Sequence, residues 1–131
     1  MRKLVLIAFA FLLLSICSAA VSAQMASRIH FRRGATTAIV TGTLNGYKSH
    51  RTFVIRVRRG QTLTTENAGK NYITVSVEAP PGSRYEQDMA ADCHDRNKVS
   101  PTAAGDYRIT VVECTKADPW RGTFKLRVSV R

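Results

Sequence analysis

The sequence predicts an all-β protein, an antiparallel β-sandwich with a jelly-roll-like arrangement of about seven or eight strands. Apolar and polar residues alternate with a period of two over several runs, which is typical of strands with one buried face. Turn-forming Gly, Pro, Asn and Asp residues separate these runs. No stretch after residue 23 carries a 3.6-residue apolar period. Two sheets are expected because a single sheet cannot cover its own apolar face.

The N-terminus has the layout of a secretory signal. Two basic residues precede an unbroken apolar run over 4–16, and small residues follow up to Ala23. The run is shorter than the roughly 20 residues that a membrane span needs. We therefore predict a signal peptide at 1–23, cleavage after Ala23, and one periplasmic or secreted sandwich domain at 24–131 without a membrane span.

Four runs carry the clearest alternation, and their inward residues are the candidate core. These are Phe53, Ile55 and Val57; Ile73, Val75 and Val77; Tyr107, Ile109 and Val111; and Phe124, Leu126, Val128 and Val130. Asn45-Gly46 predicts a tight turn. The segment 80–104 is predicted to be free of strands, and loops of that length in small domains are often functional.

Cleavage leaves two cysteines, Cys93 and Cys114, and an even pair in an exported protein predicts one disulfide. Closing a loop of around 20 residues stabilises a fold by ~3 kcal/mol. The alternative is a thiolate metal site, but only His94 lies near as a further ligand, so we expect no metal.

No catalytic motif is present. The three histidines, His30, His50 and His94, are scattered, and neither HExxH nor GxSxG occurs. The polar cluster of Asp92, His94 and Asp95 is interpreted as a solvated loop. A carboxylate pair for glycoside chemistry stays open, because its separation depends on the fold. We expect a binding protein that is not an enzyme, has no catalytic residue and needs no cofactor.

The mature chain carries 18 basic against nine acidic residues, a net charge of +9. Five cations fall on the outward phase of their strands: Arg56, Arg58, Arg108, Lys125 and Arg127. If these strands are neighbours, one sheet face is a basic stripe that attracts polyanions. An anionic cell-envelope glycan suits the exported compartment better than nucleic acid. The other interpretation is a solvated face that keeps the protein soluble.

Aromatic residues on predicted turns are candidates for binding. Tyr47 follows the Asn45-Gly46 turn, and Trp120 lies in the connection before the last strand. Trp, Tyr and Arg dominate binding hot spots. The alternative for Trp120, the single tryptophan, is a lid that folds back over the end of the core.

The order of motifs resembles a known family. Its elements are 30–34 (HFRRG), 42–47 (GTLNGY), 53–55 (FVI), 59–63 (RGQTL), 105–109 (GDYRI) and 124–130 (FKLRVSV). Together they resemble the β-sandwich of bacterial pre-peptidase C-terminal domains and, more closely, the periplasmic inhibitors of goose-type (g-type) lysozyme. The resemblance covers the chain from about residue 28 onward.

The resemblance implies a protein partner, g-type lysozyme, whose glycan cleft is plugged by loops at one end of the sandwich. It assigns target binding to Tyr47 and to a charged connection that contains Lys116, Asp118, Trp120 and Arg121. Lys116 stands where the family usually has arginine, which replaces a bidentate fork by a point charge. The sequence gives no indication of the oligomeric state.

Overall fold

The computed structural model describes residues 25–87 and 93–131, so the predicted signal peptide at 1–23 lies outside the described residues. The strands are β1 (Ser27–Arg28), β2 (Thr37–Asn45), β3 (His50–Val57), β4 (Leu63–Asn67), β5 (Ile73–Glu78), β6 (Arg96–Val99), β7 (Gly105–Glu113) and β8 (Arg121–Val130). Within the described ranges, no helix is long and apolar enough to cross a membrane.

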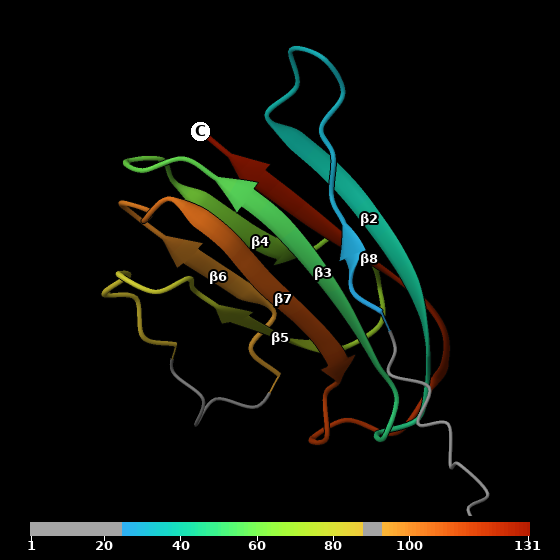
Figure 1. The fold of residues 1–131 in the computed structure, drawn as a ribbon. Coiled ribbons are helices and arrows are strands. Elements are labelled where there is room, and N and C mark those ends of the chain that lie inside the picture. Colours follow the sequence, from blue (N-terminus) through green and yellow to red (C-terminus); the bar gives the residue numbers. More distant parts are fainter. Residues whose placement is uncertain (1–24, 88–92) are drawn as a thin grey trace, which may run out of the picture.

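The strands form two four-stranded sheets that pack as a sandwich (Figure 1). One sheet has the order β1-β3-β7-β5 and the other the order β2-β8-β4-β6. Neighbouring strands are antiparallel, except that the short β1 pairs with β3 in parallel. The predicted all-β sandwich is confirmed.

The core lies between the sheets and consists of the inward residues that the alternation predicts. All thirteen of those side chains are buried, from fully buried Ile109 to 7% exposed Val130. Burial of an aliphatic or aromatic side chain contributes ~1.5–3 kcal/mol, so this layer is the main source of stability. Phe53 and Phe124 meet across it edge to face, with ring centroids 6.2 Å apart.

Register determines which connections share an end of the sandwich. The β2–β3 loop and the β7–β8 loop lie at one end, because His50 is opposite Val112 and Asn45 is opposite Arg121. We call this the Tyr47 end. The β3–β4 and β6–β7 connections lie at the opposite end, where Gly60 N donates to Thr102 O at 2.9 Å. Figure 1 shows the two ends at the bottom and the upper left of the view.

The prediction that 80–104 is free of strands is wrong. β6 lies within this segment and pairs with β4, with Val99 opposite Leu63. Its alternation is hard to see because the strand is short and one inward residue is Asn97, only 4% exposed. A polar residue at a buried position removes the apolar half of the pattern.

Candidate functional site

The β2–β3 loop presents Tyr47 at its tip. Gly46 has φ 85°, a left-handed conformation that glycine adopts without strain, so the predicted Asn45-Gly46 turn is present. Ser49 N donates to Gly46 O at 3.0 Å and closes the turn. The Tyr47 side chain is 42% exposed and is one of the large aromatic groups on the surface.

Two hydrogen bonds join this turn to the β7–β8 loop, 70 residues later in the chain. The Tyr47 hydroxyl donates to the carbonyl oxygen of Ala117. Gly46 N donates to Trp120 O at 3.3 Å. Within the second loop, Ala117 N donates to Cys114 O at 3.3 Å and bends the chain back. The fold therefore brings together the two segments to which the resemblance assigns target binding.

Trp120 takes the position that was predicted as an alternative, a lid on the core. Its side chain is partly buried and packs against the hydrophobic cluster. Its indole Nε1 donates to Tyr72 O at 3.0 Å, and its backbone N donates to Glu113 Oε1 at 2.6 Å. These contacts hold the end of the β7–β8 loop, so Trp120 fixes the loop against the core.

A disulfide joins Cys93 to Cys114 at the base of the same loop, as predicted. The Cα atoms are 4.7 Å apart, within the range that disulfides adopt. Cys114 N also donates to Tyr72 O at 3.2 Å. The start of the β7–β8 loop is thus fixed covalently to the segment that leads into β6.

Three charged side chains stand outward around this scaffold: Lys116, Asp118 and Arg121. Among the residues that the structure describes, none of the three has an ion-pair partner. Tyr72, 67% exposed, is a further aromatic group at this end that the sequence analysis missed. Its place after the Gly69-Lys70 turn was a usable signal, because it has the same turn-then-aromatic arrangement as Tyr47.

A single basic stripe required all of the strands with outward cations to be neighbours, and they are not. Arg56 and Arg108 lie on β3 and β7, whereas Lys125 and Arg127 lie on β8, in the other sheet. The outward cations therefore divide between the two outer faces. The strands alternate as predicted, but alternation alone does not say which strands are neighbours.

Each face also neutralises part of its charge. Asp106 receives two hydrogen bonds from Arg28, at 3.1 and 2.9 Å, and the hydrogen bonding and charge of Arg28 lower the pKa of Asp106. On the other face, hydrogen bonding to Arg127 lowers the pKa of Glu66, and Arg96 is 3.1 Å from the same carboxylate. The faces are mixed ionic surfaces rather than uniform basic ones.

The described residues hold no group of three or more His, Cys, Asp or Glu side chains that could bind a metal ion. Of the predicted polar cluster, Asp92 lies outside the described residues. The carbonyl oxygen of His94 accepts a hydrogen bond from Val75 N at 2.8 Å, so this residue helps hold the segment before β6 against β5.

No family model and no curated protein matches this sequence. Several solved structures match the fold, and three of them are described here. PliG from Aeromonas hydrophila, a periplasmic inhibitor of g-type lysozyme, has 22% identity and a TM-score of 0.64 over 82% of this chain and 96% of its own. The chain has the fold of that inhibitor. PliG from Salmonella Typhimurium, with the same described role, has 18% identity and a TM-score of 0.56 over 79% of this chain and 96% of its own.

A mutant of PliG from Escherichia coli, also a periplasmic inhibitor of g-type lysozyme, has a similar fold. It has 18% identity and a TM-score of 0.56 over 80% of this chain and 96% of its own. The shared fold agrees with the resemblance seen in the order of motifs. At these identities the agreement concerns architecture, and the role of each loop residue has to be argued from its geometry.

Proposed function

We propose that this protein is an exported inhibitor of g-type lysozyme that acts as a stoichiometric plug and catalyses no reaction. The inhibitory surface is the Tyr47 end, where the β2–β3 and β7–β8 loops form one unit. The observation that carries the proposal is the hydrogen bond from the Tyr47 hydroxyl to Ala117 O, which joins the two loops that the resemblance assigns to target binding. The fold shared with three inhibitors of this kind supports it.

The surface has the chemistry that a lysozyme cleft requires. Glycosidases place carboxyl groups on either side of the bond that they cleave. Lys116, exposed on the β7–β8 loop, can donate to such a carboxylate, and a charge-assisted hydrogen bond contributes ~1.5–3 kcal/mol. Tyr47 and Tyr72 supply exposed aromatic area of the kind that is enriched in binding hot spots, and Asp118 and Arg121 are exposed on the same connection as Lys116.

The loops are ordered before any partner binds. The disulfide, the Trp120 lid and the Tyr47–Ala117 hydrogen bond fix the β7–β8 loop at three points. A loop that is already in its bound conformation loses less conformational entropy on association. In this proposal Trp120 positions the loop, and Tyr47 and Lys116 contact the target.

The test is a cell-wall lysis assay with purified oxidised mature protein, titrated against g-type and chicken-type lysozymes. We expect inhibition of the g-type enzyme that saturates near one to one, and none of the chicken type. The absence of inhibition at large excess would refute the function.

The site is tested with Tyr47→Ala and Lys116→Ala, against Lys125→Ala as the matched control. Lys125 is exposed on the outer face of β8, away from both loops. Each loop variant should weaken inhibition by about 10- to 100-fold, the equivalent of 1.4–3 kcal/mol, with little change in melting temperature. Equal inhibition by all four proteins would place the inhibitory surface elsewhere.

A further inference from the structure

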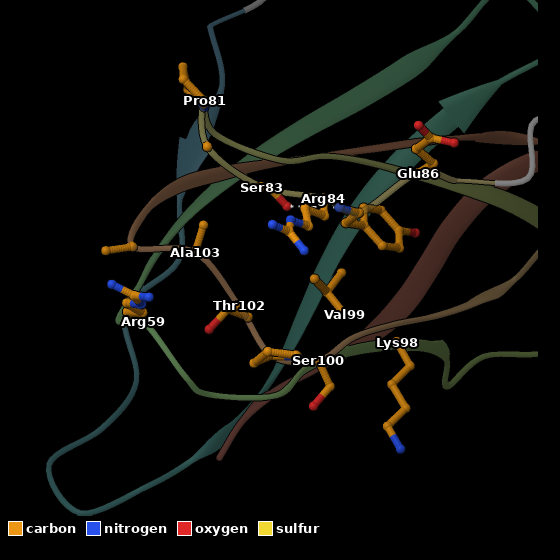
Figure 2. Close-up of a pocket in the computed structure, with 14 residues that line it drawn as sticks. Arg59, Pro81, Ser83, Arg84, Glu86, Lys98, Val99, Ser100, Thr102 and Ala103 are labelled. Carbon is orange, nitrogen blue, oxygen red and sulfur yellow. Dashed lines mark hydrogen bonds between the residues drawn. The ribbon is translucent and has the colours of Figure 1, made fainter.

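A groove lies at the end of the sandwich opposite Tyr47 and has no part in the proposed inhibitory surface. One wall is the segment 81–86 after β5, and the other is the segment 98–104, which contains the end of β6 and the turn into β7. Arg59, from the β3–β4 turn, closes one side (Figure 2). The groove is open to solvent and has a volume of ≈ 960 Å³, near the upper limit of the 300–1,000 Å³ that is usual for ligand sites.

The groove is basic. Arg59, Arg84 and Lys98 line it, against the single lining carboxylate of Glu86. None of these three cations has an ion-pair partner within the described parts of the chain. Figure 2 shows Arg84 reaching into the space between the two walls, with Arg59 and Lys98 on opposite sides of the view. Low-dielectric walls that carry one sign of charge concentrate the field and attract ions of the other sign.

Internal hydrogen bonds hold the wall at 81–86. The Tyr85 hydroxyl donates to Oδ1 of the buried Asn97 at 3.2 Å, and Tyr85 N donates to Ser83 Oγ at 3.1 Å. Just beyond, Gln87 Nε2 donates to Val75 O at 2.9 Å, and Gln87 Oε1 accepts from Val77 N. The Gln87 side chain thus occupies backbone groups along the edge of β5.

The wall at 98–104 is equally fixed. Thr102 Oγ1 donates to Arg58 O at 2.6 Å and accepts from Gln61 N at 3.0 Å. The hydroxyls of Ser100 and Thr62 are 2.7 Å apart. Both walls are therefore preformed, and a ligand would meet a rigid site rather than order it.

We propose that this groove binds an anionic saccharide, a short stretch of sugar polymer that carries carboxylate or phosphate groups. The guanidinium groups of Arg59 and Arg84 match such groups in bidentate geometry, and Lys98 adds a point charge. Tyr85, Pro81 and Pro101 also line the groove and add apolar surface, on which the C–H face of a sugar ring can pack. An acidic peptide fits less well, because Gln87 already occupies backbone groups along the β5 edge, where a peptide strand would add.

The experiment follows backbone amide chemical shifts of the oxidised protein during titration with four defined tetramers. Tetragalacturonate carries carboxylates, phosphorylated maltotetraose carries phosphates, and maltotetraose is the uncharged control. Tetraglutamate tests the peptide. We expect saturable shifts in the backbone amides of residues 82–86 and 98–104, Pro101 excepted, with one or both charged sugars. The tighter of the two identifies the preferred anion. Equal binding of maltotetraose or tighter binding of tetraglutamate would overturn the proposal.

The site is tested with the triple variant Arg59→Gln, Arg84→Gln and Lys98→Gln. Its matched control is Arg32→Gln with Arg33→Gln and Lys125→Gln, which removes the same charge from exposed positions that do not line the groove. The groove variant should bind the charged tetramer at least tenfold more weakly, and the control should bind within threefold of the unmodified protein. Equal losses in both variants would show that the net charge attracts the sugar and that the groove is not a site. The proposed inhibitory surface lies at the other end of the sandwich, so this result does not depend on whether the protein inhibits lysozyme.

Discussion

Glu113 offers a direct test of what orders the proposed inhibitory loop. It is the last residue of β7, only 1% exposed, and its Oε1 accepts the backbone hydrogen bond from Trp120 at 2.6 Å. Within the described residues, its Oε2 has no hydrogen-bond partner. One buried oxygen therefore anchors the far end of the β7–β8 loop, and the other contributes no contact that offsets its burial.

Glu113→Ala removes the acceptor and leaves the Trp120 amide without a partner. An orphaned buried donor costs ~1–3 kcal/mol, and each lost buried methylene adds about 0.8 kcal/mol. We expect a loss of about 3 kcal/mol in the free energy of unfolding. In a domain of this size, that corresponds to a fall in melting temperature of roughly 12–24 °C.

Glu113→Gln is the matched control because it keeps an oxygen where Oε1 accepts while removing a group that can bear a buried charge. Its free energy of unfolding should stay within about 1 kcal/mol of the unmodified protein. Thermal unfolding by circular dichroism gives the stabilities, and hydrogen exchange of the Trp120 amide reports the anchor itself. Exchange should accelerate in Glu113→Ala only, together with weaker inhibition of g-type lysozyme.

Two results would refute this reasoning. An unchanged Trp120 exchange rate in Glu113→Ala would show that the loop is held without this hydrogen bond. Equal destabilisation by Gln and Ala would show that the carboxyl group acts through something that the amide cannot supply, and the acceptor oxygen would not be the cause.

Three further predictions concern stability. Gly42→Ala should destabilise the fold by ~1–3 kcal/mol in denaturant titrations, because a Cβ there would lie 2.7 Å from Phe124 Cε1; no loss would mean that the ring moves aside freely. Asn97→Ala should cost roughly 2–4 kcal/mol, since its buried amide makes three hydrogen bonds, and melting within 2 °C of the unmodified protein would contradict this. Asp106→Asn should be less stable above the ordinary Asp pKa of 3.8, because pairing with Arg28 lowers the folded-state pKa of Asp106. That difference should disappear as the pH falls through the lowered value, so a difference that grows with acid would have the wrong sign.

Most of the fold could be predicted because it depends on local alternation. Inward residues such as Ile55, Val75 and Leu126 follow strict period-two runs, and each run became a strand. β6 could not be found this way, since Asn97 interrupts the apolar phase and is satisfied by hydrogen bonds to Thr65 and Val75 instead. A buried side chain that is stabilised by polar contacts from distant strands leaves no periodic signal.

The basic faces show a different limit. Alternation correctly places Arg56 and Arg127 outward, but it gives each strand only an inside and an outside. Which cations share a face depends on strand order, and strand order depends on long-range pairing that no local pattern encodes. For a similar reason, the sequence could not decide whether Trp120 is a binding residue or a lid on the core. Its lid position is fixed by a hydrogen bond to Tyr72, 48 residues earlier.

The placement of the candidate site has a topological cause. In a simple antiparallel sandwich, successive connections alternate between the two ends, so counting strands would assign each loop to an end. Here β5 and β6 both run from the Tyr47 end to the opposite end. The first residue of β5, Ile73, lies opposite Glu113 at the end of β7, and the first residue of β6, Arg96, lies opposite Glu66 near the end of β4. β5 therefore ends at the end of the sandwich opposite to the one where β6 begins, which shifts the count by one. This shift puts the β7–β8 loop beside Tyr47, and puts 81–86 beside the turn into β7. Both proposed binding surfaces thus depend on one long connection, in the segment where the sequence predicted a functional loop.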